Sequence, residues 1–112
     1  MGDKGAKQSA AGATMAGRLV DEFAHLGNVT TKKMFGGHGV FEEGVMFAIV
    51  DSAGDAFLRA DETTSQRFED AGSPRHSRMP YWQIPAAVLD DSKQLATWAR
   101  SARDVARAAK KK

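Results

Sequence analysis

The chain has 112 residues and no cysteine, so we expect one small domain without disulfides or thiolate metal sites. Sixteen lysine and arginine residues stand against fourteen aspartate and glutamate residues, a formal net charge of +2. Five of the basic residues and one acidic residue lie in the segments 1–14 and 110–112, so residues 15–109 carry a net charge of −2. This distribution excludes a domain-wide basic surface of the kind that binds nucleic acid.

The predicted elements begin with one helix and four strands. Apolar residues at helical spacing predict the helix, which ends at a glycine-asparagine pair: Met15, Leu19, Phe23 and Leu26. Apolar patterning predicts strands over residues 30–35, over 39–50 as two strands, and over 56–59. The turn-prone pair Glu43-Gly44 joins the two middle strands as a hairpin.

A helix and an edge strand are predicted next. Asp61 is placed to cap a helix that runs to Ala71, and Gly72 is placed to end it. Residues 79–84 predict an edge strand, because Pro80 lacks the N–H that a central strand needs. Such an edge makes pairing between two copies of the chain plausible.

The last elements are a short helical turn opened by Pro85 and a long helix capped by Ser92. The predicted order is therefore α-β-β-β-β-α-β-α. Because no helical crossover separates the successive strands, the sheet should be mostly antiparallel, with about five strands. The sequence predicts a two-layer α+β domain with helices packed on the sheet.

The organisation of the chain follows from its ends and its apolar content. Residues 1–14 are expected to form a disordered tail, 15–109 the folded domain and 110–112 a basic tail. No 18-residue apolar run is present, and residues 1–14 lack the apolar stretch of a signal peptide. A cytoplasmic protein is expected. We expect no cofactor and no metal, since the three histidines show no paired ligand spacing.

Residues 32–39, KKMFGGHG, place three glycines around one histidine. A phosphate-binding loop would be followed by a helix, whereas strand-like residues follow here, so that interpretation fails. Glycine within a strand pattern is typical of a bulge or bend, which is the interpretation we favour. His38, in a tight bend, is expected at the surface, and neither catalysis nor metal binding is expected of it.

Two sets of residues are candidates for function. Tyr81 and Trp82 are adjacent in a strand and point to opposite faces, so either one packs inward and the other contacts a protein partner, or both are buried. The basic face of the last helix is either a partner or phosphate surface or a solvated face; it comprises Arg100, Arg103 and Arg107. The alternative is a small-anion site or enzyme built on the 74–78 loop PRHSR and neighbouring groups: His38, Arg59, Arg75, His76 and Arg78.

Four short motifs are familiar as a set: Met34-Phe35-Gly36-Gly37, Gly44 with Met46-Phe47, Arg59-Ala60-Asp61, and Met79-Pro80-Tyr81-Trp82. With these motifs the chain resembles the N-terminal domain of the TfoX/Sxy family, bacterial regulators of natural competence. The resemblance covers residues 15–107. Full-length regulators of this kind carry a second, helical C-terminal domain, and this chain ends at Lys112, so it resembles a stand-alone form.

The resemblance implies a two-layer fold with an antiparallel sheet, similar to secretion-chaperone-like domains. It also implies a link to transcription control alongside a cyclic-AMP-responsive activator. We therefore expect a non-enzymatic regulatory module that binds a protein partner, either a transcription activator or another copy of itself. Nucleic acid is expected to bind weakly and without sequence preference at most.

Overall fold

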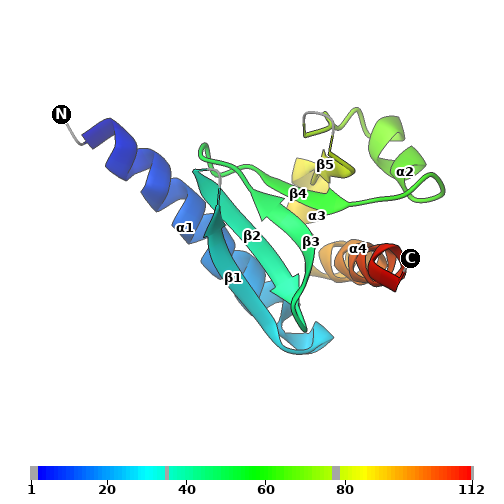
Figure 1. The fold of residues 1–112 in the computed structure, drawn as a ribbon. Helices are drawn as coiled ribbons and strands as arrows, with labels where there is room; N and C mark the ends of the chain where they lie inside the picture. The colour runs from blue at the N-terminus through cyan, green and yellow to red at the C-terminus, as the bar shows by residue number, and fades with distance from the viewer. Residues whose placement is uncertain (1–2, 35, 77–78, 112) are drawn as a thin grey trace.

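The computed structural model describes residues 3–34, 36–76 and 79–111. Its five strands form one antiparallel sheet in the order β1-β2-β3-β4-β5, with the helices packed on it (Figure 1). The elements in chain order are α1 (Asp3–Phe23), η1 (Ala24–Leu26), β1 (Val29–Met34), β2 (Gly37–Glu42), β3 (Val45–Val50), β4 (Ala56–Arg59), α2 (Ser65–Asp70), β5 (Tyr81–Gln83), α3 (Ala86–Leu89) and α4 (Ser92–Lys111). The predicted α+β class and order of elements are confirmed.

The two long helices cover the same face of the sheet. In Figure 1, α1 lies behind β1 and β2, and α4 lies beside β3 and β4. The main core fills the space between these layers and includes Leu19 and Phe23 of α1, Phe47 and Leu58 of the sheet, and Leu95 of α4. The opposite face carries only a small cluster of buried residues, Ile49, Phe57 and Tyr81. One face of the sheet is therefore without a helical layer.

The β2–β3 hairpin has the turn that the sequence predicts. Glu43 and Gly44 both have positive φ angles, 52° and 80°, which match the right-handed twist of the flanking strands. The hairpin also contains an irregularity: Val40 pairs with Ala48 but Phe41 pairs with Met46, so Phe47 has no partner in the register. This additional residue directs Phe47 into the main core.

The glycines at the start of β2 have two roles, of which the sequence predicts one. Gly36 has a φ of 78° and makes the turn between β1 and β2, so the expected bend lies there. The bulge lies further along, at Val40 and Phe41. Gly37 is needed for space rather than for its backbone angles, because a Cβ atom there would overlap the carbonyl oxygen of Val50 on β3. Its lack of a side chain allows β2 and β3 to approach each other.

The helix ends differ from the prediction at three points. The first helix begins at Asp3, within the segment expected to be a disordered tail. The helix expected from Asp61 begins at Ser65, because Asp61 itself closes a tight turn with Thr63 and Thr64. The last helix is capped by Asp91, whose Oδ1 accepts hydrogen bonds from the backbone N–H groups of Lys93 and Gln94, rather than by Ser92.

The two edges of the sheet are unequal. The backbone N–H of His76 donates to the Tyr81 carbonyl oxygen at 2.8 Å, and that of Gln83 donates to the Pro74 carbonyl oxygen at 2.9 Å. The 74–76 segment thus covers the outer side of β5, the edge at which pairing between two copies is predicted. At the other edge, no strand of the described residues pairs with the outer side of β1.

Candidate functional site

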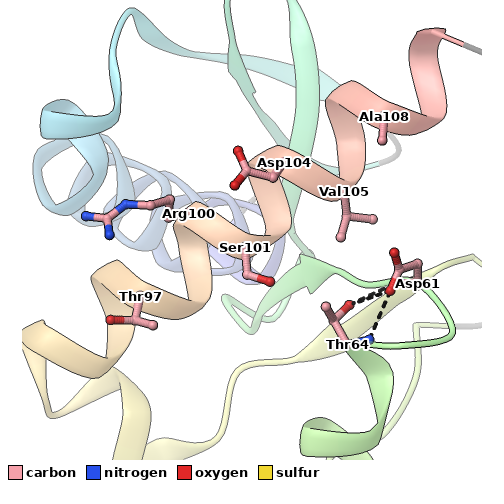
Figure 2. A pocket seen from close by; sticks show the side chains of 8 residues that line it. All are labelled: Asp61, Thr64, Thr97, Arg100, Ser101, Asp104, Val105 and Ala108. Carbon is pink, nitrogen blue, oxygen red and sulfur yellow. Dashed lines mark hydrogen bonds between the residues drawn. The ribbon is translucent and has the colours of Figure 1, made fainter.

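A groove runs between α4 and the turn that precedes α2 (Figure 2). It has a volume of about 420 Å³ and is lined by Asp61, Thr64, Thr97, Arg100, Ser101, Asp104, Val105 and Ala108. Ser101 and Val105 face the Asp61–Thr64 turn, whereas Arg100 extends away from it. The lining combines hydroxyl groups and carboxylates without an imidazole, so no described residue there can serve as the base that activates a hydroxyl nucleophile in the usual serine–histidine arrangement.

The Asp61 turn is held by its own hydrogen bonds. Its Oδ1 accepts from the Thr63 hydroxyl at 2.8 Å and from the Thr64 backbone N–H at 2.9 Å. These two interactions, the Thr63 hydroxyl first, hold the pKa of Asp61 below its ordinary value. The Oδ1 atom of Asp61 is therefore occupied by the loop, which gives this residue a structural role.

The basic face of α4 is largely used inside the molecule. Arg107 donates to the Oε1 of Glu42 at 2.5 Å, and the Glu42 side chain is only 2% exposed. Arg103 donates to the carbonyl oxygen of Leu26 at 3.1 Å and pairs with the neighbouring Asp104. Two of the three arginines predicted to contact a partner thus fasten α4 to β2 and η1. Arg100 is exposed and is the remaining member of this set with a free approach from solvent.

The two adjacent aromatic residues of β5 point to opposite faces, as predicted. Tyr81 is 1% exposed, and its hydroxyl donates to the carbonyl oxygen of Met46 at 3.2 Å. Burial raises the pKa of Tyr81, with the nearby Arg59 acting in the other direction. Trp82 is half-buried beneath Phe68 of α2, and the Arg75 guanidinium lies 4.8 Å from its ring centroid. Tyr81 is therefore closed to a partner, whereas part of Trp82 remains accessible beside Phe68 and Arg75.

The structure describes four of the five predicted anion contacts and places them in different surroundings. His38 lies on the helical side of the sheet, and Arg78 lies outside the described residues. Arg75 covers Trp82 and donates from Nε to the Met79 carbonyl oxygen, and His76 packs edge-on against Phe57. Arg59 faces a different pocket. Of the four described residues, Arg59 and His76 line different pockets.

His38 is buried rather than exposed, which corrects the expectation from the sequence. It is 9% exposed, and its ring lies against α1, where a Cβ atom on Gly12 would meet Nδ1 at 3.4 Å. Its Nδ1 atom has no hydrogen-bond partner among the described residues. The reason is that β2 lies under α1, so alternate residues of this strand face the helix.

Replacement of His38 tests this packing role. We expect His38→Ala to lower the free energy of unfolding by about 1–2 kcal/mol, since it leaves a cavity beneath α1. His38→Leu should be at least as stable as the wild type, because it fills the space and removes an unsatisfied nitrogen. Urea unfolding followed by circular dichroism measures both. A surface histidine would give no loss in the alanine variant.

A second pocket lies at the end of α4 and was not predicted from the sequence. It has a volume of about 270 Å³ and is lined by Gly44, Val45, Met46, Arg59, Tyr81, Ala106, Ala109 and Lys110. Gly44, Met46, Arg59 and Tyr81 belong to three different motifs that carry the family resemblance. Their convergence was hidden because the turn, β4 and β5 are distant in the sequence. Arg59 and Tyr81 are the lining residues that the sequence names as functional candidates.

The described ranges 3–34, 36–76 and 79–111 also bear on metal binding and membrane insertion. No group of three or more histidine, aspartate and glutamate residues there is arranged to hold a metal ion. No described helix has the length and apolar character needed to cross a membrane.

The fold and pockets define a small α+β domain with two surface pockets along α4. The sequence profile described as the TfoX N-terminal domain matches residues 21–106. The chain therefore belongs to the TfoX N-terminal domain family, as the motifs predict. A comparison with curated proteins finds no match.

Proposed function

We propose that this protein is a regulatory interaction module that acts by binding another protein at the open edge of its sheet, strand β1. The observation that carries the proposal is the contrast between the two edges. The outer side of β5 is covered by the 74–76 segment, whereas β1 has no partner on its outer side among the described residues. An uncovered edge offers backbone N–H and C=O groups to an added strand.

The charge of β1 favours an acidic partner over a second copy. Residues 30–33 are exposed and include Lys32 and Lys33, which project to opposite faces of the strand. Two copies paired through this edge would bring four lysines together, and like charges across strands are destabilising. An extended segment with carboxylates on both faces would instead complement them. The regulatory part of the proposal is supported by membership of the TfoX N-terminal domain family, which is not known as a family of enzymes.

Charge reversal on β1 tests the proposal. The wild type and the double variant Lys32→Glu/Lys33→Glu are used to capture proteins from the cell of origin, and each captured protein is purified and titrated against both forms. We expect the double variant to bind at least about tenfold more weakly. Hydrogen exchange on the complex should show slower exchange of the β1 amides.

A matched control comes from exposed basic residues elsewhere. Lys93→Glu/Arg100→Glu makes the same change of charge on α4, away from the sheet edge, and should bind like the wild type. Equal binding by the β1 variant, or protection confined to α4, would contradict the proposal. If the free wild-type protein is a dimer and the Lys32→Glu/Lys33→Glu variant is a monomer, the partner is instead a second copy of the chain.

Nucleic acid is not proposed as the partner. Arg103 and Arg107 are engaged within the molecule, which reduces the basic groups that α4 can offer for phosphate contacts. We expect duplex DNA to bind no more tightly than about 10⁻⁶ M at physiological salt, without sequence preference. Removal of Lys110–Lys112 should lower the salt slope by nearly three if these residues make the contacts.

Gel shifts at several salt concentrations, with the full chain and the truncated form, measure both quantities. A matched pair of duplexes, of equal length and different sequence, tests for preference. A nanomolar, sequence-selective shift that survives the truncation would show that the domain reads DNA itself.

A further inference from the structure

Arg59 is half-buried and has no anionic partner among the residues that the structure describes. It lies in β4 opposite Tyr81 of β5, and its Cζ atom is 5.8 Å from the Tyr81 ring centroid. Its Nε atom is buried and donates to no acceptor among the described residues. The three ion pairs found in the described side chains involve other residues. A guanidinium withdrawn from water normally binds a carboxylate, a phosphate or a carbonyl group.

The surroundings of Arg59 add a second cation and no opposing charge. Lys110, near the end of α4, lines the same pocket, and none of the residues that line it is acidic. The Arg59 pocket therefore differs from the groove in Figure 2, whose lining includes two carboxylates and one arginine. Arg107, one turn before Lys110, is already neutralised by Glu42. The charge that faces the pocket is therefore positive and unbalanced.

The remaining lining is apolar. Val45 and Met46 come from β3, and Ala106 and Ala109 come from α4. The Tyr81 hydroxyl is directed at the Met46 carbonyl oxygen and so is not free to donate to a ligand. A volume of about 270 Å³ is close to the lower end of ordinary small-molecule sites. The pocket thus combines cationic groups with an apolar wall and admits a compact ligand.

We propose that this pocket, defined by Arg59 and Lys110, binds a small organic anion, in which a carboxylate or phosphate group is joined to an apolar body. The oxyanion would accept hydrogen bonds from the Arg59 guanidinium and interact with the Lys110 ammonium group. The apolar body would lie against Val45, Met46 and the two alanines. This site is separate from β1, so the proposal is independent of the proposed protein partner.

Four probes separate the features of the ligand. Hexanoate and hexyl phosphate carry the two oxyanions on the same apolar body, hexanamide lacks the charge, and inorganic phosphate lacks the apolar body. Amide shifts of Gly44 and Ala106 in ¹⁵N spectra of the full chain report occupancy. We expect at least one of the two hexyl anions to saturate these shifts with a Kd of about 1 mM or lower. Hexanamide and inorganic phosphate should bind at least about tenfold more weakly.

Single substitutions show which residues contribute to binding of the anion. Arg59→Gln should weaken binding of the hexyl anion by about tenfold or more. Lys110→Gln should weaken it by about threefold, because Lys110 is more exposed to solvent. Arg100→Gln, in the other groove, should leave binding unchanged. Absence of saturable binding by both hexyl anions overturns the proposal, and so does equal binding of hexanamide or of inorganic phosphate. Binding that persists in both the Arg59 and Lys110 variants also overturns it.

Discussion

Gly37→Ala is expected to lower the free energy of unfolding by about 3 kcal/mol, a large loss for the addition of one methyl group. The added Cβ would overlap the Val50 carbonyl oxygen and lie 3.0 Å from the Asp51 Cα atom. Both contacts are with backbone, which cannot rotate away as a side chain can. β2 and β3 would have to separate at this position.

A matched substitution provides the control. Gly17 lies in α1 with no atom within 4 Å of the position that its Cβ would take, so Gly17→Ala should raise stability by about 0.5–1 kcal/mol through helix propensity. The same glycine-to-alanine substitution is then expected to lower the free energy of unfolding at Gly37 and to raise it at Gly17. Urea denaturation of both variants at one pH measures the difference. If Gly37→Ala is as stable as the wild type, the close approach of β2 and β3 does not require glycine.

The strands and turns were predictable because their signals are local. Glu43-Gly44 marks a hairpin by its own backbone preferences, and Pro85 marks the start of α3 in the same way. The sequence also indicated that glycine is required at position 37, but it indicated a backbone bend as the reason instead of a steric one. Positive φ is a property of one residue, whereas the overlap with Val50 depends on how closely two strands approach.

The candidate sites were less predictable because they depend on contacts between distant residues. Arg107 pairs with Glu42, 65 residues earlier, and only the packing of α4 on the sheet brings them together. An amphipathic pattern shows which residues share a helix face, but it does not distinguish a face in water from one that meets a buried carboxylate. The pocket at Arg59 is hidden in the same way, since its lining comes from β3, β4, β5 and α4.

Arg107→Met should lower the free energy of unfolding by about 2–3 kcal/mol. It leaves the Glu42 carboxylate, 2% exposed, without its partner, and an unpaired buried charge is strongly destabilising. The expected loss of stability is smaller than the largest losses known for broken buried ion pairs, because Arg107 itself is 43% exposed. Water can therefore reach the carboxylate once the arginine is removed. Arg100→Met, an exposed arginine on the same helix, should change stability by less than about 0.5 kcal/mol.

The double variant Glu42→Met/Arg107→Met distinguishes a requirement for pairing from a requirement for the arginine alone. Removing both charges leaves two apolar side chains of similar length between β2 and α4, so stability should return to within about 1 kcal/mol of the wild type. The coupling between the two sites, obtained from urea unfolding of both single variants and the double variant, should then exceed about 1 kcal/mol. Additive losses would mean that Glu42 and Arg107 stabilise the domain independently. In that case α4 would be held to the sheet by its apolar face, through Leu95, Ala99 and Ala102, without help from the ion pair.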